Sequence, residues 1–149
     1  MTDLLELLKR YNGPTPRYTS YPPVPNWQAA HRGLLISALR RSTAPLSIYV
    51  HIPFCERLCL YCGCNVVVKK DHSVAYGYVK SLLEEIDLAQ VAHHRVVTQM
   101  HWGGGTPTYL DANQITQLFN AIADRFHLAA DAELSIEIDP RVTSLEHLR

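Results

Sequence analysis

The sequence predicts an α/β fold in which parallel strands alternate with helices. From residue 46 onward, segments with a period of two alternate with segments of helical spacing, in the order strand, helix, strand, helix, strand. This order is typical of βαβ units, whose parallel strands form a sheet with helices on its outside. Each expected strand also keeps one polar side. That pattern favours a barrel that holds a ligand, because a parallel sheet buried on both faces is almost entirely apolar.

Residues 1–45 are expected to form an N-terminal region ahead of the α/β core at residues 46–149. Residues 3–11 have the apolar spacing of a short helix, with Asp3 and Glu6 in the spacing of a capping box. A Gly-Pro pair follows and predicts the end of this helix.

A proline-rich segment comes next. Five prolines between residues 14 and 25 predict an extended arm, because proline fixes its own backbone and lacks a donor for regular structure. A second helix is expected to start after Asn26, with Trp27 and Leu39 on its apolar side, and Pro45 ends the connection to the core.

In the core, the sequence predicts strands at 46–52, 96–102 and 133–139, helices at 73–90 and after Asp111 and Gln114, and a last helix near Ser144. The apolar side of the strands is expected to lie beneath the helices and includes Leu46, Ile48, Val50, Leu134, Ile136 and Ile138. The polar side is expected to share one face: Tyr49, His51, Gln99, His101, Ser135, Glu137 and Asp139.

Composition limits the class of protein. The chain has 149 residues, of which 47% are hydrophobic, as expected for one folded domain or part of a larger one. Its 14 basic and 14 acidic residues cancel, so general attraction to nucleic acid or to an anionic membrane is not expected. An apolar run of about 18 residues and a secretory leader are both missing from the sequence, which favours a cytoplasmic protein.

All four cysteines fall within ten positions, as Cys55, Cys59, Cys62 and Cys64. This clustering disfavours a secreted disulfide framework, which spreads its cysteines to join distant segments. Three thiolates in C-x3-C-x2-C spacing on one loop can reach three corners of a four-iron cubane and leave the fourth iron open. A zinc site that uses all four cysteines is the alternative, although structural zinc sites usually have a second ligand pair further along the chain.

The cysteine loop and a Gly-Gly-Gly-Thr-Pro segment at 103–107 both follow the ends of expected strands. α/β folds place their sites at this edge, because the carboxyl ends of parallel strands meet there. Taken alone, the glycine segment could also be a plain turn between strand and helix.

The segment CERLCLYC at 55–62 resembles the cluster motif of radical S-adenosylmethionine (SAM) enzymes. Five longer segments together resemble the family of oxygen-independent coproporphyrinogen III oxidases: RYTSYPP at 17–23, YVHIPFC at 49–55, CGCN at 62–65, HWGGGTPTYL at 101–110 and SIEIDPR at 135–141. This resemblance covers nearly the whole chain. It implies the N-terminal part of a radical SAM partial (β/α) barrel, similar to a TIM barrel.

The resemblance also implies roles for single residues. Cys55, Cys59 and Cys62 match the ligands of a [4Fe–4S] cluster, whereas Cys64 matches no ligand. The matched contacts to a cluster-bound SAM are Tyr49, Gly104 and Glu137, and those to a second SAM molecule are Tyr61, Gly105 and Thr106. Arg17 in the arm is expected to contact a substrate carboxylate, because a guanidinium binds a carboxylate at two points.

The implied reaction is the oxidative decarboxylation of two propionate side chains of coproporphyrinogen III, which gives protoporphyrinogen IX in haem biosynthesis. The implied partners are this tetrapyrrole and an electron-donor protein such as a flavodoxin or ferredoxin, without nucleic acid or membrane. Two alternatives stay open. One is a haem-binding or haem-trafficking protein on the same scaffold, which the arm and Cys64 disfavour. The other is a structural zinc module.

The length of the chain departs from the resemblance. A full eight-stranded barrel takes about 250 residues, whereas residues 46–149 would supply the first three βα units. We therefore expect this chain to be the N-terminal portion of an enzyme, with an unpaired edge on its sheet. The full-length enzyme would also contain a C-terminal half. The N-terminal portion keeps the cluster ligands and is expected to have little activity alone.

Overall fold

The computed structural model describes residues 3–12, 24–29 and 31–148, which fall into two compact units, Met1–Leu34 and Leu35–Arg149. The predicted contact residue Arg17 and most of the predicted arm lie outside the described residues. The domain boundary predicted after residue 45 stays a prediction.

Helix α1 (Leu4–Tyr11) forms where the sequence predicts it, and the Asp3 side chain caps it by accepting a hydrogen bond from the Leu5 amide at 3.1 Å. The expected start of the second helix is wrong, because α2 begins only at Arg32 and ends at Arg41. A 3₁₀ turn, η1 (Val24–Asn26), contains Asn26, so this residue does not cap a following helix. Within the described residues, every helix is too short or too polar to span a membrane.

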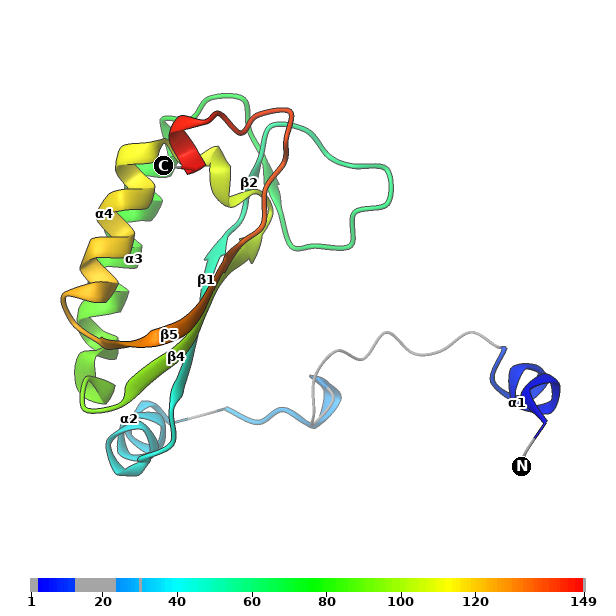
Figure 1. Cartoon of the computed structure of the whole chain (residues 1–149), viewed down its shortest axis with the longest axis horizontal. Coiled ribbons are helices and arrows are strands. Elements are labelled where there is room, and N and C mark those ends of the chain that lie inside the picture. The colour runs from blue at the N-terminus through cyan, green and yellow to red at the C-terminus, as the bar shows by residue number, and fades with distance from the viewer. Residues whose placement is uncertain (1–2, 13–23, 30, 149) are drawn as a thin grey trace. The chain divides into compact units, whose positions relative to one another are not determined.

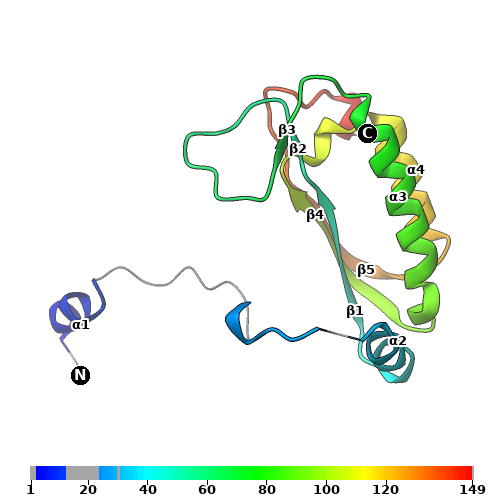
Figure 2. The same cartoon turned by 180° about the vertical axis from the view of Figure 1, so that it is seen from behind.

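Three parallel strands form the centre of the second unit: β1 (Leu46–Ile52), β4 (Val96–Gly104) and β5 (His127–Ile136), in the order β1-β4-β5. Helices α3 (Val74–Ala89) and α4 (Ala112–Ala123) lie side by side along one face of this sheet (Figures 1 and 2). A 3₁₀ turn, η2 (Gln90–Ala92), continues α3. The alternating order and the parallel pairing confirm the α/β prediction.

The hydrophobic core lies between the sheet and the two helices. Its buried members include Val50, Ile52, Val97, Met100, Trp102, Val79, Leu118 and Ile122. They come from one side of β1 and β4 and from the inward stripe of each helix. Burial of this apolar surface is the main force that holds the helices on the sheet, and it leaves the opposite face of the sheet free for polar side chains.

The N-terminus of α4 has the predicted capping box. Asp111 accepts a hydrogen bond from the Gln114 amide at 2.8 Å, and the Gln114 side chain accepts one from the Asp111 amide at 3.0 Å. We expect Asp111→Ala to lower the free energy of unfolding by about 1 kcal/mol, because the substitution leaves an amide without its partner. Urea unfolding measures this loss. The same substitution at Asn113, an exposed residue of the same turn, should change stability by less than about 0.5 kcal/mol.

The third strand differs from its prediction. It starts at His127 and ends at Ile136, so Glu137 and Asp139 follow the strand instead of lying in it. Leu134 and Ile136 face α4 as expected, but they are 51% and 36% exposed because β5 is the edge strand of the described sheet. Ile138 lies away from the helices and lines the cavity of the cysteine loop.

The last predicted helix is shorter than expected. The segment after Ser144 forms one 3₁₀ turn, η4 (Glu146–Leu148). The His147 ring accepts a hydrogen bond from the Ser144 amide at 3.0 Å and contacts the Leu110 carbonyl at 2.9 Å. These bonds tie the turn to the segment that precedes α4.

Candidate metal and cofactor site

The cysteine loop leaves the sheet directly after β1. Two short strands, β2 (Phe54–Cys55) and β3 (Val67–Val68), pair in parallel and close the base of the loop. The Val67 amide donates to the Pro53 carbonyl at 2.7 Å, and the Lys69 amide donates to the Cys55 carbonyl at 2.9 Å. Figure 2 shows the loop between these strands extending from one end of the sheet. The ladder therefore fixes where the loop begins and ends.

A cavity of about 780 Å³ lies between this loop and the ends of β4 and β5. Its walls contain eight of the ten predicted site residues: Cys55, Cys59, Cys62, Tyr61, Gly104, Gly105, Thr106 and Glu137. Tyr49 lies on the neighbouring strand β1, and Arg17 is outside the described residues. The structure thus brings together segments that are far apart in the sequence. The contact between Cys59 and Arg141, for example, joins residues 82 positions apart.

Gly104 and Gly105 of the glycine segment line the cavity beside the cysteine loop. Gly104 has a φ of 115°, which is strained for any residue with a Cβ, and a Cβ there would lie 2.8 Å from the His51 ring. A Cβ at Gly105 would lie 2.7 Å from the Phe54 carbonyl oxygen. The Gly105 amide donates to the Ile52 carbonyl at 2.8 Å. The end of β4 therefore runs directly against the start of the cysteine loop.

Thr106 links this wall to the first cysteine. Its hydroxyl lies 3.4 Å from the Cys55 sulfur, within the range of a hydrogen bond to sulfur, and its amide donates to the Phe54 carbonyl at 2.8 Å. Thr106 is buried. The Thr106 hydroxyl therefore lies beside the Cys55 thiol in the cavity wall.

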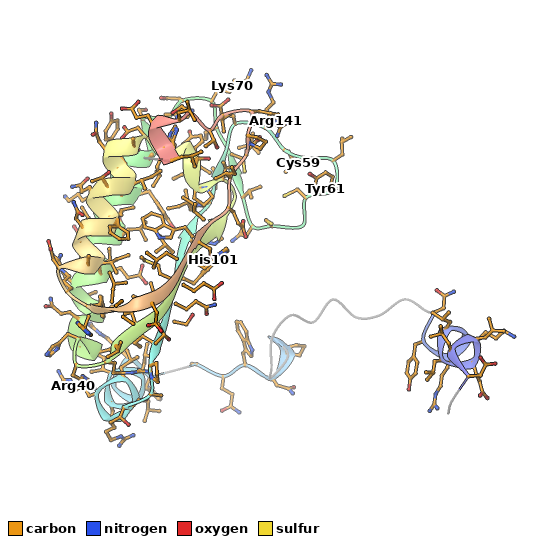
Figure 3. The ribbon with its side chains drawn as sticks, in the orientation of Figure 1. Arg40, Cys59, Tyr61, Lys70, His101 and Arg141 are labelled. Carbon is orange, nitrogen blue, oxygen red and sulfur yellow. The ribbon has the colours of Figure 1, made fainter. Side chains whose placement is uncertain are left out.

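A polar network covers the open face of the sheet, as the sequence predicts. Tyr49, His101 and Ser135 lie opposite one another on β1, β4 and β5. The His101 ring contacts the Ser135 hydroxyl at 2.8 Å and the Glu137 carboxylate at 3.2 Å. Partial burial and the nearby Glu137 carboxylate raise the pKa of the Tyr49 hydroxyl. Figure 3 shows His101 on the face turned away from α3 and α4.

Sequence reasoning gave no role to Arg141, which lies at the rim of the cavity. Its guanidinium binds Asp139 with contacts of 2.6 to 3.1 Å and also approaches the Cys59 sulfur at 3.8 Å. The hydrogen bonds from Arg141 lower the pKa of the Asp139 carboxyl. Arg141, Cys59 and Tyr61 lie at the same end of the sheet in Figure 3. The Asp-x-Arg spacing in the sequence was the available signal for this pair.

A second missed cluster anchors the loop beside its first cysteine. Glu56 contacts the His72 ring at 3.0 Å, and the other ring nitrogen contacts the Tyr109 carbonyl at 2.9 Å. The His72 ring also stacks on the ring of Tyr109, which is buried in the core, at a centroid distance of 4.0 Å. These residues come from separate parts of the chain, so no local pattern in the sequence could indicate the cluster.

The donor set suits an iron–sulfur cluster by its chemistry. Cys55, Cys59 and Cys62 are free thiols that are partly exposed at the cavity, and thiolates are the ligands that such clusters take. Across the described ranges, no three Cys, His, Asp or Glu side chains converge on a single-ion site. Cys64 is exposed, and the neighbouring Cys62 sulfur raises the pKa of its thiol.

Comparison with known proteins points to one family. The model of the radical SAM superfamily matches residues 49–149. The structure is also similar to that of the coproporphyrinogen III oxidase of Escherichia coli, a radical SAM enzyme, with a TM-score of 0.83 and 41% sequence identity. That similarity covers 97% of this chain and 33% of the E. coli chain.

Curated relatives give the same result. The oxygen-independent coproporphyrinogen III oxidase of Salmonella typhimurium is 44% identical over 151 residues, which cover 97% of this chain and 33% of the relative. The protein of the same name from Mannheimia haemolytica is 44% identical over 139 residues, which cover 91% of this chain and 95% of the relative. The chain therefore spans about a third of the length of the Salmonella relative and nearly all of the Mannheimia one.

Proposed function

The chain belongs to the radical SAM superfamily, within the oxygen-independent coproporphyrinogen III oxidases, and we propose that it acts in the oxidative decarboxylation of coproporphyrinogen III. Membership of the superfamily implies a [4Fe–4S] cluster and SAM. The observation that carries the proposal is the single cavity in which the three motif cysteines meet the glycine segment and Glu137.

In this proposal, Cys55, Cys59 and Cys62 hold the cluster. This assignment is supported by the position of all three thiols on one closed loop at the cavity. The Thr106 hydroxyl lies beside the first of them, Cys55. When bound, the cluster supplies an open iron for SAM and the electron for its cleavage, which is the source of the radical chemistry. Cys64 is left without a ligand role.

The remaining cavity residues, together with Tyr49 on β1, bind the organic cofactor in this proposal. Glu137 accepts hydrogen bonds from an ammonium group or ribose hydroxyls, and Tyr49 offers a ring and a hydroxyl beside it. Gly104 lets a ligand approach the main chain closely. We assign a second SAM molecule to Tyr61, Gly105 and Thr106, which line the same cavity.

The substrate in this proposal is a tetrapyrrole. Each of two propionate groups loses a hydrogen atom from its β-carbon, a molecule of carbon dioxide and one electron, and a vinyl group remains. An external acceptor takes the electron, and a flavodoxin or ferredoxin reduces the cluster. Arg17 is assigned to a substrate carboxylate, for which its fork of donors is suited. The cytoplasmic location stays a prediction.

Anaerobic reconstitution of the chain tests the proposal. The expected result is about four irons and equal sulfide per chain, the content of one cubane, with SAM-dependent formation of 5′-deoxyadenosine. Coproporphyrinogen III is then added with a reductant and an acceptor, and the products are separated by chromatography. Bound zinc without iron would overturn the proposal in favour of a structural zinc module. Tetrapyrrole binding without SAM cleavage would overturn it in favour of a haem-handling protein.

A further inference from the structure

The polar face of the sheet holds a histidine that the proposed function does not use. His101 lies at the centre of β4, directly opposite Tyr49 on β1 and Ser135 on β5. Its side chain is 38% exposed, so it faces the open side of the sheet and not the core. Two of its neighbours in the network, Tyr49 and Glu137, are cofactor contacts in the proposed function.

The hydrogen-bond partners of the neutral His101 ring favour one of its two tautomers. The Glu137 carboxylate, when ionised, can only accept, so the His101 Nε2–H donates to it across 3.2 Å. In the neutral ring Nδ1 is then the acceptor, and the Ser135 hydroxyl donates to it across 2.8 Å. Ser135 thereby orients the ring, and the ring occupies one oxygen of the carboxylate. The second oxygen is left for a donor on a ligand.

The ring also contacts the other cofactor residue. Tyr49 and His101 stack with their centroids 5.8 Å apart and their planes 18° from parallel. The Tyr49 hydroxyl and the Glu137 carboxylate each lie 3.0 Å from the position that a Cβ at residue 103 would occupy. The two groups therefore flank one small gap above Gly103. His101 hydrogen-bonds the carboxylate and stacks on the ring that carries the hydroxyl.

The Glu137 side chain needs such support. It follows the end of β5, and its amide donates to the Trp102 carbonyl at 2.9 Å, which fixes its main chain only. The side chain is 53% exposed, and in the described part of the chain His101 is the side chain that hydrogen-bonds it. Without the imidazole, the carboxylate could adopt several rotamers, and binding would have to order it.

We propose that His101 is a positioning residue that holds the Glu137 carboxylate and the Tyr49 ring in the arrangement that binds SAM. This inference rests on the proposed function, because it takes Glu137 and Tyr49 as contacts to that cofactor. It assigns His101 no contact with the reacting atoms.

The test measures SAM binding to the anaerobically reconstituted chain. His101→Phe keeps a ring on Tyr49 but removes both hydrogen bonds, and we expect it to weaken binding roughly ten- to a hundredfold, as loss of a hydrogen bond to a charged group does. His101→Gln retains an amide donor for Glu137 and should bind within about threefold of the wild type. His127→Phe is the matched control, since His127 is an exposed histidine at the start of β5, and it should bind as the wild type does.

A double-mutant cycle separates positioning from general stability. In a Glu137→Gln background, His101→Phe should cost less than about threefold in affinity, because the two residues act as one unit. Equal losses in both backgrounds would overturn the inference. Nitrogen-15 NMR of the His101 ring provides a readout without SAM: the Nε2–H tautomer is expected, and its signals should shift in Glu137→Gln. Unshifted signals would also overturn the inference.

The two proposals fail in different ways. If the reconstituted wild-type chain holds a cluster but binds no SAM, both the proposed function and the role of His101 are wrong. If the wild type binds SAM and His101→Phe binds it within about twofold, only the role of His101 is wrong, since a tenfold effect is the least expected from the lost hydrogen bond. Iron content and thermal unfolding, measured on every variant, show that each protein is folded and loaded.

Discussion

Serine in place of Cys55, Cys59 or Cys62 should reduce the iron bound after anaerobic reconstitution from about four atoms per chain to below about one. The serine hydroxyl stays protonated near neutral pH and is a harder donor than a thiolate, so it does not replace a cluster ligand. With two motif cysteines left on the loop beside Cys64, the cluster has lost one of its three anchors. SAM cleavage should then fall below detection. Iron and sulfide analysis, together with the visible absorption of the cluster, measures the loss.

Cys64→Ser is the matched control, because Cys64 lies on the same loop and is exposed. We expect this variant to keep its full iron content. The comparison also decides between the two metal sites considered from the sequence, since a zinc site built from all four cysteines would lose its metal in every one of the four variants. Retention of iron in any of the three motif variants, or loss of iron in Cys64→Ser, would contradict the proposed ligand set.

Local patterns in the sequence predicted most of the fold. The period-two run of β1 and the stripes of α3 and α4 agree with the structure, because each depends on residues that are near neighbours in the chain. The cap at Asp111 agrees for the same reason. The start of β5 was missed because the segment from His127 to Ala132 has weak alternation, and its pairing with Val96 and Val97 decides its conformation.

The candidate site was predicted in part. The cysteine spacing and the glycine segment are contiguous motifs, and the parallel fold explains why both lie at the same end of the sheet. The supporting contacts were not predictable in this way. Glu56 and His72 meet across 16 positions and Arg141 and Cys59 across 82, so only the tertiary structure brings each pair together. Such contacts decide how firmly the loop is held, which spacing alone does not reveal.

Alanine in place of Gly105 should have the second large effect, on the fold and the site together. Its Cβ would lie 2.7 Å from the Phe54 carbonyl oxygen and 2.9 Å from the Pro53 main chain, and main-chain atoms cannot rotate away as a side chain can. Either β4 or the start of the cysteine loop must move. We expect the free energy of unfolding to fall by roughly 2–4 kcal/mol, in the upper range of overpacking and strain effects.

The same movement should reach the cysteines, because Gly105 and Cys55 are joined through short bonds. The Gly105 amide bonds the Ile52 carbonyl, and Phe54, which the new Cβ would meet, directly precedes Cys55. Gly105→Ala is therefore expected to take up less iron even under conditions in which it remains folded.

Gly77→Ala on α3 is the control, since a Cβ there meets no atom within 4 Å, and it should raise stability by about 0.5–1 kcal/mol. Urea unfolding and iron analysis measure both variants. Wild-type iron uptake and stability in Gly105→Ala would mean that the close packing of β4 on the loop does not determine the geometry of the cluster site.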